Sequence, residues 1–178
     1  MKRAPSVGLF HYQAGRILWR KSDFALALAE VTTALSLEPN MIDAHLFVGQ
    51  IFFRDQEFGK AARHFQAVLK VRPHDPTALM GLAECNIQSG DARGAMEYLE
   101  RGNKKFPDEP LFAIRTAEVL ELYLNDFAGA IERYKEILAN ARGGRYKNKP
   151  EMNIAQKILD LEMSSRAGRA TASVKELK

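Results

Sequence analysis

The side chains that could perform chemistry in this 178-residue chain are four histidines and one cysteine: His11, His45, His64, His74 and Cys85. Imidazole and thiolate groups hold zinc when they recur at short fixed spacings. The sequence contains neither an HExxH segment nor a CxxC pair. One cysteine also excludes an internal disulfide. These residues therefore predict no metal site and no disulfide framework.

No set of residues has the spacing of a catalytic site. The two glycines at 143–144 lack the lysine and hydroxyl residue of a phosphate-binding loop. The carboxylates at 108–109 precede a helix start, where negative charge favours the helix dipole. Cys85 lies within a predicted helix, which favours a structural thiol, and the recurrence of His11 and His45 34 residues apart favours packing. We therefore expect no enzyme activity and no cofactor.

A period of 34 residues identifies the elements that would position a binding site. Pro39, Pro73 and Pro107 are spaced by 34. Before each proline, a small residue is followed 12 residues later by a second small residue, and four residues after that by a bulky residue. A fourth copy of this pattern has its second small residue 13 residues after the first. The small pairs are Gly15 and Ala27, Gly49 and Ala61, Ala83 and Ala95, and Ala117 and Ala130, followed by Val31, Phe65, Leu99 and Tyr134. Small side chains let two antiparallel helices cross closely, with the larger ones packed around the crossing.

This pattern resembles the tetratricopeptide repeat (TPR) family over about residues 8–143. The resemblance implies an all-α fold, a right-handed α-solenoid of TPR helix–turn–helix hairpins with a C-terminal capping helix. Helices are expected at about 8–21, 24–37, 42–54, 58–71, 76–88, 92–105, 110–124 and 127–140. The predicted parts are an N-terminal extension 1–7, repeats 8–41, 42–75, 76–109 and a divergent 110–143, a linker and capping helix 144–163, and a basic tail 164–178.

The C-terminal region differs from the repeats in pattern and charge. Residues 143–149 are predicted to be a polar linker, and a helix over 150–163 would place Ile154, Ile158 and Leu161 on one side to cover the last repeat. Residues 141–178 hold nine Lys and Arg against four Asp and Glu, a net of +5 in a chain of net charge +4. Such a tail could tether the chain to nucleic acid or an anionic membrane, although a solubilising end is the simpler interpretation. The tail has no interleaved aromatic residues for base stacking, which disfavours nucleic acid.

The sequence also carries information about location. No apolar run approaches the roughly 18 residues that a membrane-spanning helix needs. The basic residues at the N-terminus are not followed by an apolar core, so they do not form a secretory signal. We expect a cytoplasmic protein, and a signal or anchor missing from the chain stays an open alternative.

In the family that this chain resembles, the first helix of every repeat lines a concave face. Helical geometry selects the second, fifth, ninth, twelfth and thirteenth places of the 34-residue frame. The predicted peptide-binding groove comprises Leu9, Tyr12, Arg16, Trp19, Arg20, Leu46, Gln50, Phe53, Arg54, Met80, Glu84, Ile87, Ile114, Glu118 and Glu121.

The groove face is unusually apolar because of Trp19, Phe53, Met80 and Ile87. Three interpretations stay open: a groove for a partner segment, coverage by the chain itself, and a self-association surface. Arginines early and glutamates late in the groove would orient a bound segment. We expect a non-catalytic protein–protein interaction module, an adaptor, scaffold or chaperone, that binds another protein through apolar anchors. A self-assembling structural scaffold and a basic-tail tether are the alternatives.

Overall fold

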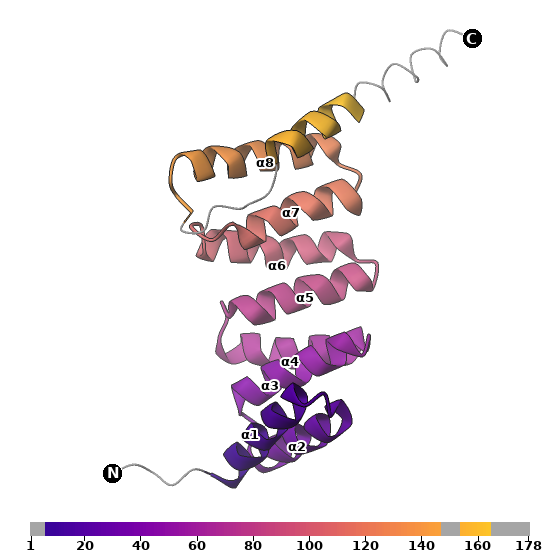
Figure 1. Cartoon of the computed structure of the whole chain (residues 1–178), viewed down its shortest axis with the longest axis vertical. Coiled ribbons are helices and arrows are strands. Elements are labelled where there is room, and N and C mark those ends of the chain that lie inside the picture. The colour runs from indigo at the N-terminus through magenta and orange to yellow at the C-terminus, as the bar shows by residue number, and fades with distance from the viewer. Residues whose placement is uncertain (1–5, 147–153, 165–178) are drawn as a thin grey trace, which may run out of the picture. The chain divides into compact units, whose positions relative to one another are not determined.

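The computed structural model describes residues 6–146 and 154–164, which form helices and their connections without a strand. The first four helices are α1 (Val7–Arg20), α2 (Phe24–Leu37), α3 (Ile42–Arg54) and α4 (Phe58–Val71). The next four are α5 (Pro76–Gln88), α6 (Ala92–Lys105), α7 (Pro110–Leu122) and α8 (Phe127–Arg142), and residues 154–164 form a further helix (Figure 1). The predicted helix bounds agree with these to within two residues. The prediction of an all-α solenoid of helical hairpins is confirmed.

Side-chain caps and left-handed turn residues set the helix ends. The Ser6 hydroxyl accepts a hydrogen bond from the backbone N–H of Leu9 at 3.2 Å, and the Asp75 carboxylate accepts one from that of Ala78 at 3.0 Å. The turn inside each hairpin places one residue at positive φ, at equivalent positions of the four repeats. These residues are Ser22, Gln56, Gly90 and Asn125. A left-handed residue at the end of a helix lets the chain reverse direction with its last carbonyls bonded.

The helices of the α1–α2 and α3–α4 hairpins cross where the sequence supplies small residues. A Cβ added at Gly15 would lie 2.3 Å from Cγ2 of Val31 and 3.0 Å from the backbone oxygen of Ala27. One added at Gly49 would lie 2.8 Å from the ring of Phe65. The alanines that begin the pattern in the second helices, Ala27, Ala61, Ala95 and Ala130, are all 0 % exposed. The predicted crossing residues are therefore buried at close contacts.

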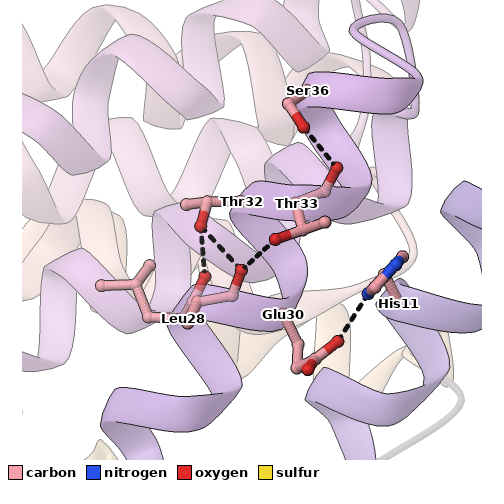
Figure 2. Close-up of polar contacts among 7 residues, drawn as sticks. His11, Leu28, Glu30, Thr32, Thr33 and Ser36 are labelled. Atoms are coloured by element: carbon pink, nitrogen blue, oxygen red, sulfur yellow. Dashed lines mark hydrogen bonds and ion pairs between the residues drawn. The ribbon is translucent and has the colours of Figure 1, made fainter.

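The hydroxyl groups of Thr32, Thr33 and Ser36 on α2 are satisfied within that helix. The hydroxyls of Thr32 and Thr33 donate to backbone carbonyls one turn earlier, and the Ser36 hydroxyl donates to the carbonyl of Thr33 at 2.8 Å (Figure 2). These bonds let hydroxyl residues occupy a helix without leaving unpaired polar groups. None of the helices among the described residues is long and apolar enough to cross a membrane.

The chain divides into two compact units, Met1–Asp91 and Ala92–Lys178. Unit 1 holds α1–α5, and one of its core clusters consists of Val31, Ala44 and Val48 with partly buried neighbours such as Phe47. Unit 2 holds α6–α8 and residues 154–164. The division falls between the two helices of the predicted third repeat, and the repeat boundaries themselves stay a prediction.

In unit 2, the helix at 154–164 covers the last hairpin as its apolar pattern predicts. Ile154, Ile158 and Leu161 are 2 %, 7 % and 8 % exposed, in one cluster with residues of α7 and α8. The prediction of a polar linker at 143–149 is wrong at Tyr146, which is 5 % exposed and joins this cluster because its ring adds apolar area to the core. Residues 1–5, 147–153 and 165–178 lie outside the described residues, and with them most of the predicted extension and tail and part of the predicted linker.

Two glycine-to-alanine changes in unit 1 test the crossing. Gly15→Ala should lower the free energy of unfolding by about 1–3 kcal/mol, because its Cβ meets Val31 and a backbone oxygen. Gly59→Ala is the matched control, since nothing lies within 4 Å of its Cβ. It should raise stability by about 0.5–1 kcal/mol through the lower backbone entropy of alanine. Denaturant melts measure both, and equal effects of the two changes would contradict the assigned crossing.

Candidate functional site

A cleft of about 400 Å³ opens in unit 1 between α1, α3 and the start of α5. Helices α1 and α3, the first helices of the first two hairpins, contribute polar and aromatic side chains to this cleft. The lining residues are Tyr12, Arg16, Trp19, Arg20, Asp43, Leu46, Phe47, Gln50 and Thr77. The structure therefore brings together six residues of the predicted groove, namely Tyr12, Arg16, Trp19, Arg20, Leu46 and Gln50.

Phe47 lines the cleft although it stands at the sixth place of the 34-residue frame, which helical geometry did not select. Its ring makes edge contacts with Tyr12 at 6.3 Å and Trp19 at 5.6 Å between centroids. Edge-to-face aromatic pairs at this separation stabilise one another. A signal was present, because Asp43, Phe47 and Gln50 have the i, i+4, i+7 spacing that puts residues on one helix face.

Trp19 is half-buried by neighbours from its own unit. The ring of Phe24 lies 4.8 Å from it, and the Arg54 guanidinium lies 4.9 Å from the Trp19 centroid and 3.5 Å from that of Phe24. Arg54 also pairs with Asp55 at 2.6 Å. Arg54 therefore covers Trp19 from the side and does not line the cleft. The predicted groove residue Phe53 packs on Phe58 at 5.4 Å, also away from the cleft.

The cleft has an excess of positive charge along α1. Arg16 and Arg20 are exposed and one turn apart on a helix that contains no Asp or Glu. Arg16 donates to the Gln13 side chain at 3.5 Å, and no carboxylate among the described residues forms an ion pair with either arginine. Asp43, the acidic lining residue, is paired with Arg72 at 3.0 Å. The two arginines are therefore available to an anionic group from outside.

The other predicted groove residues of α1 and α5, and Ile114 of α7, do not line the cleft. Leu9 is 36 % exposed, whereas Met80 and Glu84 of α5 and Ile114 of α7 are half-buried, and none of them lines the cleft. Ile87 is wrong as an exposed groove residue, because it is 4 % exposed. It stands at the place of two larger aromatic residues in the earlier repeats, and its shorter side chain lies within the packed interior.

The predicted acidic groove residues of unit 2 already have partners within that unit. Glu118 pairs with Arg115 at 3.0 Å. Glu121 accepts a hydrogen bond from the Tyr134 hydroxyl at 2.9 Å and pairs with Lys157 of the terminal helix at 3.1 Å. Burial raises the pKa of Tyr134 to about 12, so its hydroxyl stays protonated and donates to the carboxylate. Glu121 therefore links α7 to α8 and to the terminal helix, whereas Glu118 forms its ion pair within α7.

The recurring histidines form polar links between the two helices of a hairpin. His11 Nδ1 lies 2.7 Å from a carboxylate oxygen of Glu30 (Figure 2). At the equivalent positions of the next hairpin, His45 Nδ1 lies 3.0 Å from Nδ1 of His64, and His45 Nε2 lies 2.9 Å from the carbonyl of Pro39. Among the described residues, no group of three His, Cys, Asp or Glu side chains could hold a metal ion.

The histidine pair predicts a pH dependence of stability. Burial, and then the charge of His45, lower the pKa of His64 below 6.5. Between this lowered value and 6.5 the unfolded chain binds more protons than the folded one, so stability falls as the pH falls below about 6.5. His64→Glu should recreate the pair found in the first hairpin, and the variant should lose less stability between about pH 7.5 and about pH 5.5. Denaturant melts at both pH values measure this loss of stability, and His74→Glu, at an exposed histidine, is the control. Equal acid sensitivity of wild type and His64→Glu would refute the role of the histidine pair.

Cys85 should react slowly with thiol reagents. It is 2 % exposed, and burial, with a smaller effect of Glu84, raises its pKa to about 11 from 9.0. Since the thiolate is the reactive form, alkylation at neutral pH should be at least about 100-fold slower in the folded chain than in denaturant. Labelling followed by mass spectrometry measures both rates, and equal rates would show an accessible thiol.

Two family models match the chain, and both are described as Tetratricopeptide repeat. One matches residues 12–62 and the other residues 52–117, so together they include every cleft residue. U-box domain-containing protein 70 of Oryza sativa subsp. japonica is 26% identical over 137 residues, 75% of this chain and 16% of that protein. Hsp70-Hsp90 organizing protein 2 of Arabidopsis thaliana is 26% identical over 101 residues, 56% of this chain and 17% of that protein. The chain thus spans less than a fifth of the length of these curated relatives.

A solved structure has a similar fold. MamA 41-end from Desulfovibrio magneticus RS-1 matches with a TM-score of 0.70, covering 76% of this chain and 76% of that chain. Its sequence is 19% identical, and a likeness at that identity shows the fold alone.

Proposed function

We propose that this chain is a non-catalytic protein-interaction module and that unit 1 binds a segment of a partner protein in its cleft. The first part of the proposal follows from the family, because the chain belongs to the tetratricopeptide repeat family. TPR proteins are in general protein-interaction modules built from repeats that present a binding surface. The observation that carries the finer proposal is the pair of exposed arginines beside an aromatic wall in one open cleft.

The cleft offers an apolar site and an anionic site next to each other. Tyr12, Leu46 and Phe47 present apolar surface, and Arg16 and Arg20 lie on the same helix as Tyr12. A partner side chain such as Leu or Phe would bury its surface against the first group. A neighbouring Asp or Glu would form charge-assisted hydrogen bonds with the guanidinium groups, which are stronger than neutral ones.

The polar lining residues suit a peptide backbone. Gln50 of α3 and Thr77 of α5 line the cleft with side chains that both donate and accept hydrogen bonds. Asp43 adds little repulsion against an acidic segment, because Arg72 already offsets its charge at 3.0 Å. The favoured ligand is therefore an extended or helical segment with one apolar anchor flanked by acidic residues.

The aromatic anchor is tested by two phenylalanine changes on the same helix. Phe47→Ala should weaken binding by about 2 kcal/mol, since it removes the aromatic surface of the cleft. Phe53→Ala is the matched control, because Phe53 is a half-buried residue of α3 that packs outside the cleft. The probe is a set of short synthetic peptides with one Leu or Phe flanked by Asp or Glu, measured by fluorescence anisotropy. Equal losses for both variants would show that binding does not use the cleft.

The charge preference is tested by a second pair of variants. Arg20→Glu should slow association and reduce its salt dependence, because exposed charges act mainly on the rate of encounter. Arg93→Glu makes the same charge change at an exposed residue of unit 2 and should leave both quantities near wild type. Peptides with Lys in place of Asp and Glu should bind poorly to wild type, and tight binding of these peptides would refute the proposal.

A further inference from the structure

The outer face of α1 is apolar and open to solvent. Phe10, Ala14 and Ile17 lie on one face at i, i+4, i+7, and Phe10 and Ile17 are 61 % and 54 % exposed. The residues at the same three places of α3, α5 and α7 are each no more than 2 % exposed. They are Ala44, Val48 and Ile51 in α3, Ala78, Leu82 and Cys85 in α5, and Phe112, Thr116 and Val119 in α7.

Those places are buried by the helix that precedes each of them. Helix α2 packs on α3, α4 on α5, and α6 on α7. No helix precedes α1 among the described residues. The terminal repeat of a solenoid normally carries a polar outer face, because an apolar one would face water. The α1 face instead has the composition of an internal contact between repeats.

The helix at 154–164 is buried on one face and carries exposed apolar side chains on the other. Ile154, Ile158 and Leu161 repeat the i, i+4, i+7 spacing of the inter-repeat contact and are buried, so this helix packs as the first helix of a further repeat. Its opposite face carries Leu159 and Met163, which are 53 % and 69 % exposed. No described helix follows it to cover that face.

Among the described residues, the charged side chains that border the two faces differ in sign. Helix α1 has no acidic residue, and exposed Arg20 and Lys21 lie at its C-terminal end. On the helix at 154–164, exposed Asp160 adjoins Leu159. The one lysine of that helix, Lys157, is directed at Glu121 within its own unit. Contact between unlike faces therefore joins opposite charges, whereas contact between two α1 faces would bring two basic helices together.

We propose that copies of this chain associate head to tail, with the Phe10–Ile17 face of α1 in one copy packed on the Leu159–Met163 face of the helix at 154–164 in the next. Each helix then covers a face that no described helix of its own chain covers. Such a contact is heterologous, so it adds copies in series. It leaves the cleft residues Tyr12 and Arg16 on a different face of α1, and Arg20 is the α1 residue that borders both surfaces. The α1 face is about two helical turns long and the Leu159–Met163 face about one. The association is therefore weak and concentration-dependent.

Single charged substitutions at exposed positions separate the two faces. The weight-average mass of wild type, followed by light scattering in a dilution series, should rise with concentration. Ile17→Asp removes the first face and Met163→Asp the second, and each variant alone should stay at the mass of one chain. Val71→Asp is the matched control, because Val71 is 63 % exposed on α4 and belongs to neither face. It should associate like wild type, and circular dichroism checks that all variants keep their helix content.

Mixing the two variants gives the decisive measurement. The Ile17→Asp copy keeps an intact second face and the Met163→Asp copy an intact first face, so the mixture should form dimers with one copy of each and nothing larger. A wild type that stays at the mass of one chain at every concentration would overturn the proposal. So would dimers of Met163→Asp alone, which would indicate contact between two α1 faces. Peptide binding by the diluted chain would be unaffected by either result.

Discussion

The close crossing of the two helices in the α1–α2 and α3–α4 hairpins is the contact on which the rest of unit 1 depends. At Gly15 and Gly49 the facing side chains of Val31 and Phe65 come so near that a methyl group could not be added without displacement. This approach fixes the rotation of the first helix about its axis. Because one side of the first helix packs at the crossing, its other faces contact the preceding repeat, the following repeat or the solvent. The cleft is a consequence, because it is formed by the faces of α1 and α3 that the crossing directs outward.

The helices and the crossings could be predicted because they follow from local spacing. Helix α3 begins and ends at the predicted residues, and the alanines of the second helices are completely buried. The capping role of Ile154, Ile158 and Leu161 was also visible, because an apolar stripe after the last repeat has one surface to cover. Tyr146 could not be recognised in this way, since a single aromatic residue among polar neighbours has no periodicity.

The candidate site could be predicted only in part, because places on a helix do not determine what neighbouring helices cover. Tyr12, Arg16 and Gln50 line one cleft, whereas Ile87 at a corresponding place is buried. Arg54 was expected to project into the groove and instead lies across the ring of Trp19. Each outcome depends on the length of the side chain and on the residues that meet it from another helix. Those pairings are contacts between distant parts of the sequence.

Helix α1 shows why exposure is difficult to infer from a repeat pattern. Its residues face three surroundings: α2 at Gly15, the cleft at Tyr12 and Arg16, and the outer side at Phe10 and Ile17. In an internal repeat the third face is core, and the sequence of α1 is apolar there as it is in α3. The periodicity of α1 therefore predicts burial of Phe10 and Ile17, although no described helix provides it. An apolar face costs free energy in water roughly in proportion to its area. A chain whose first helix keeps such a face, and whose last described helix keeps a second one of opposite flanking charge, can lower that cost by joining the two.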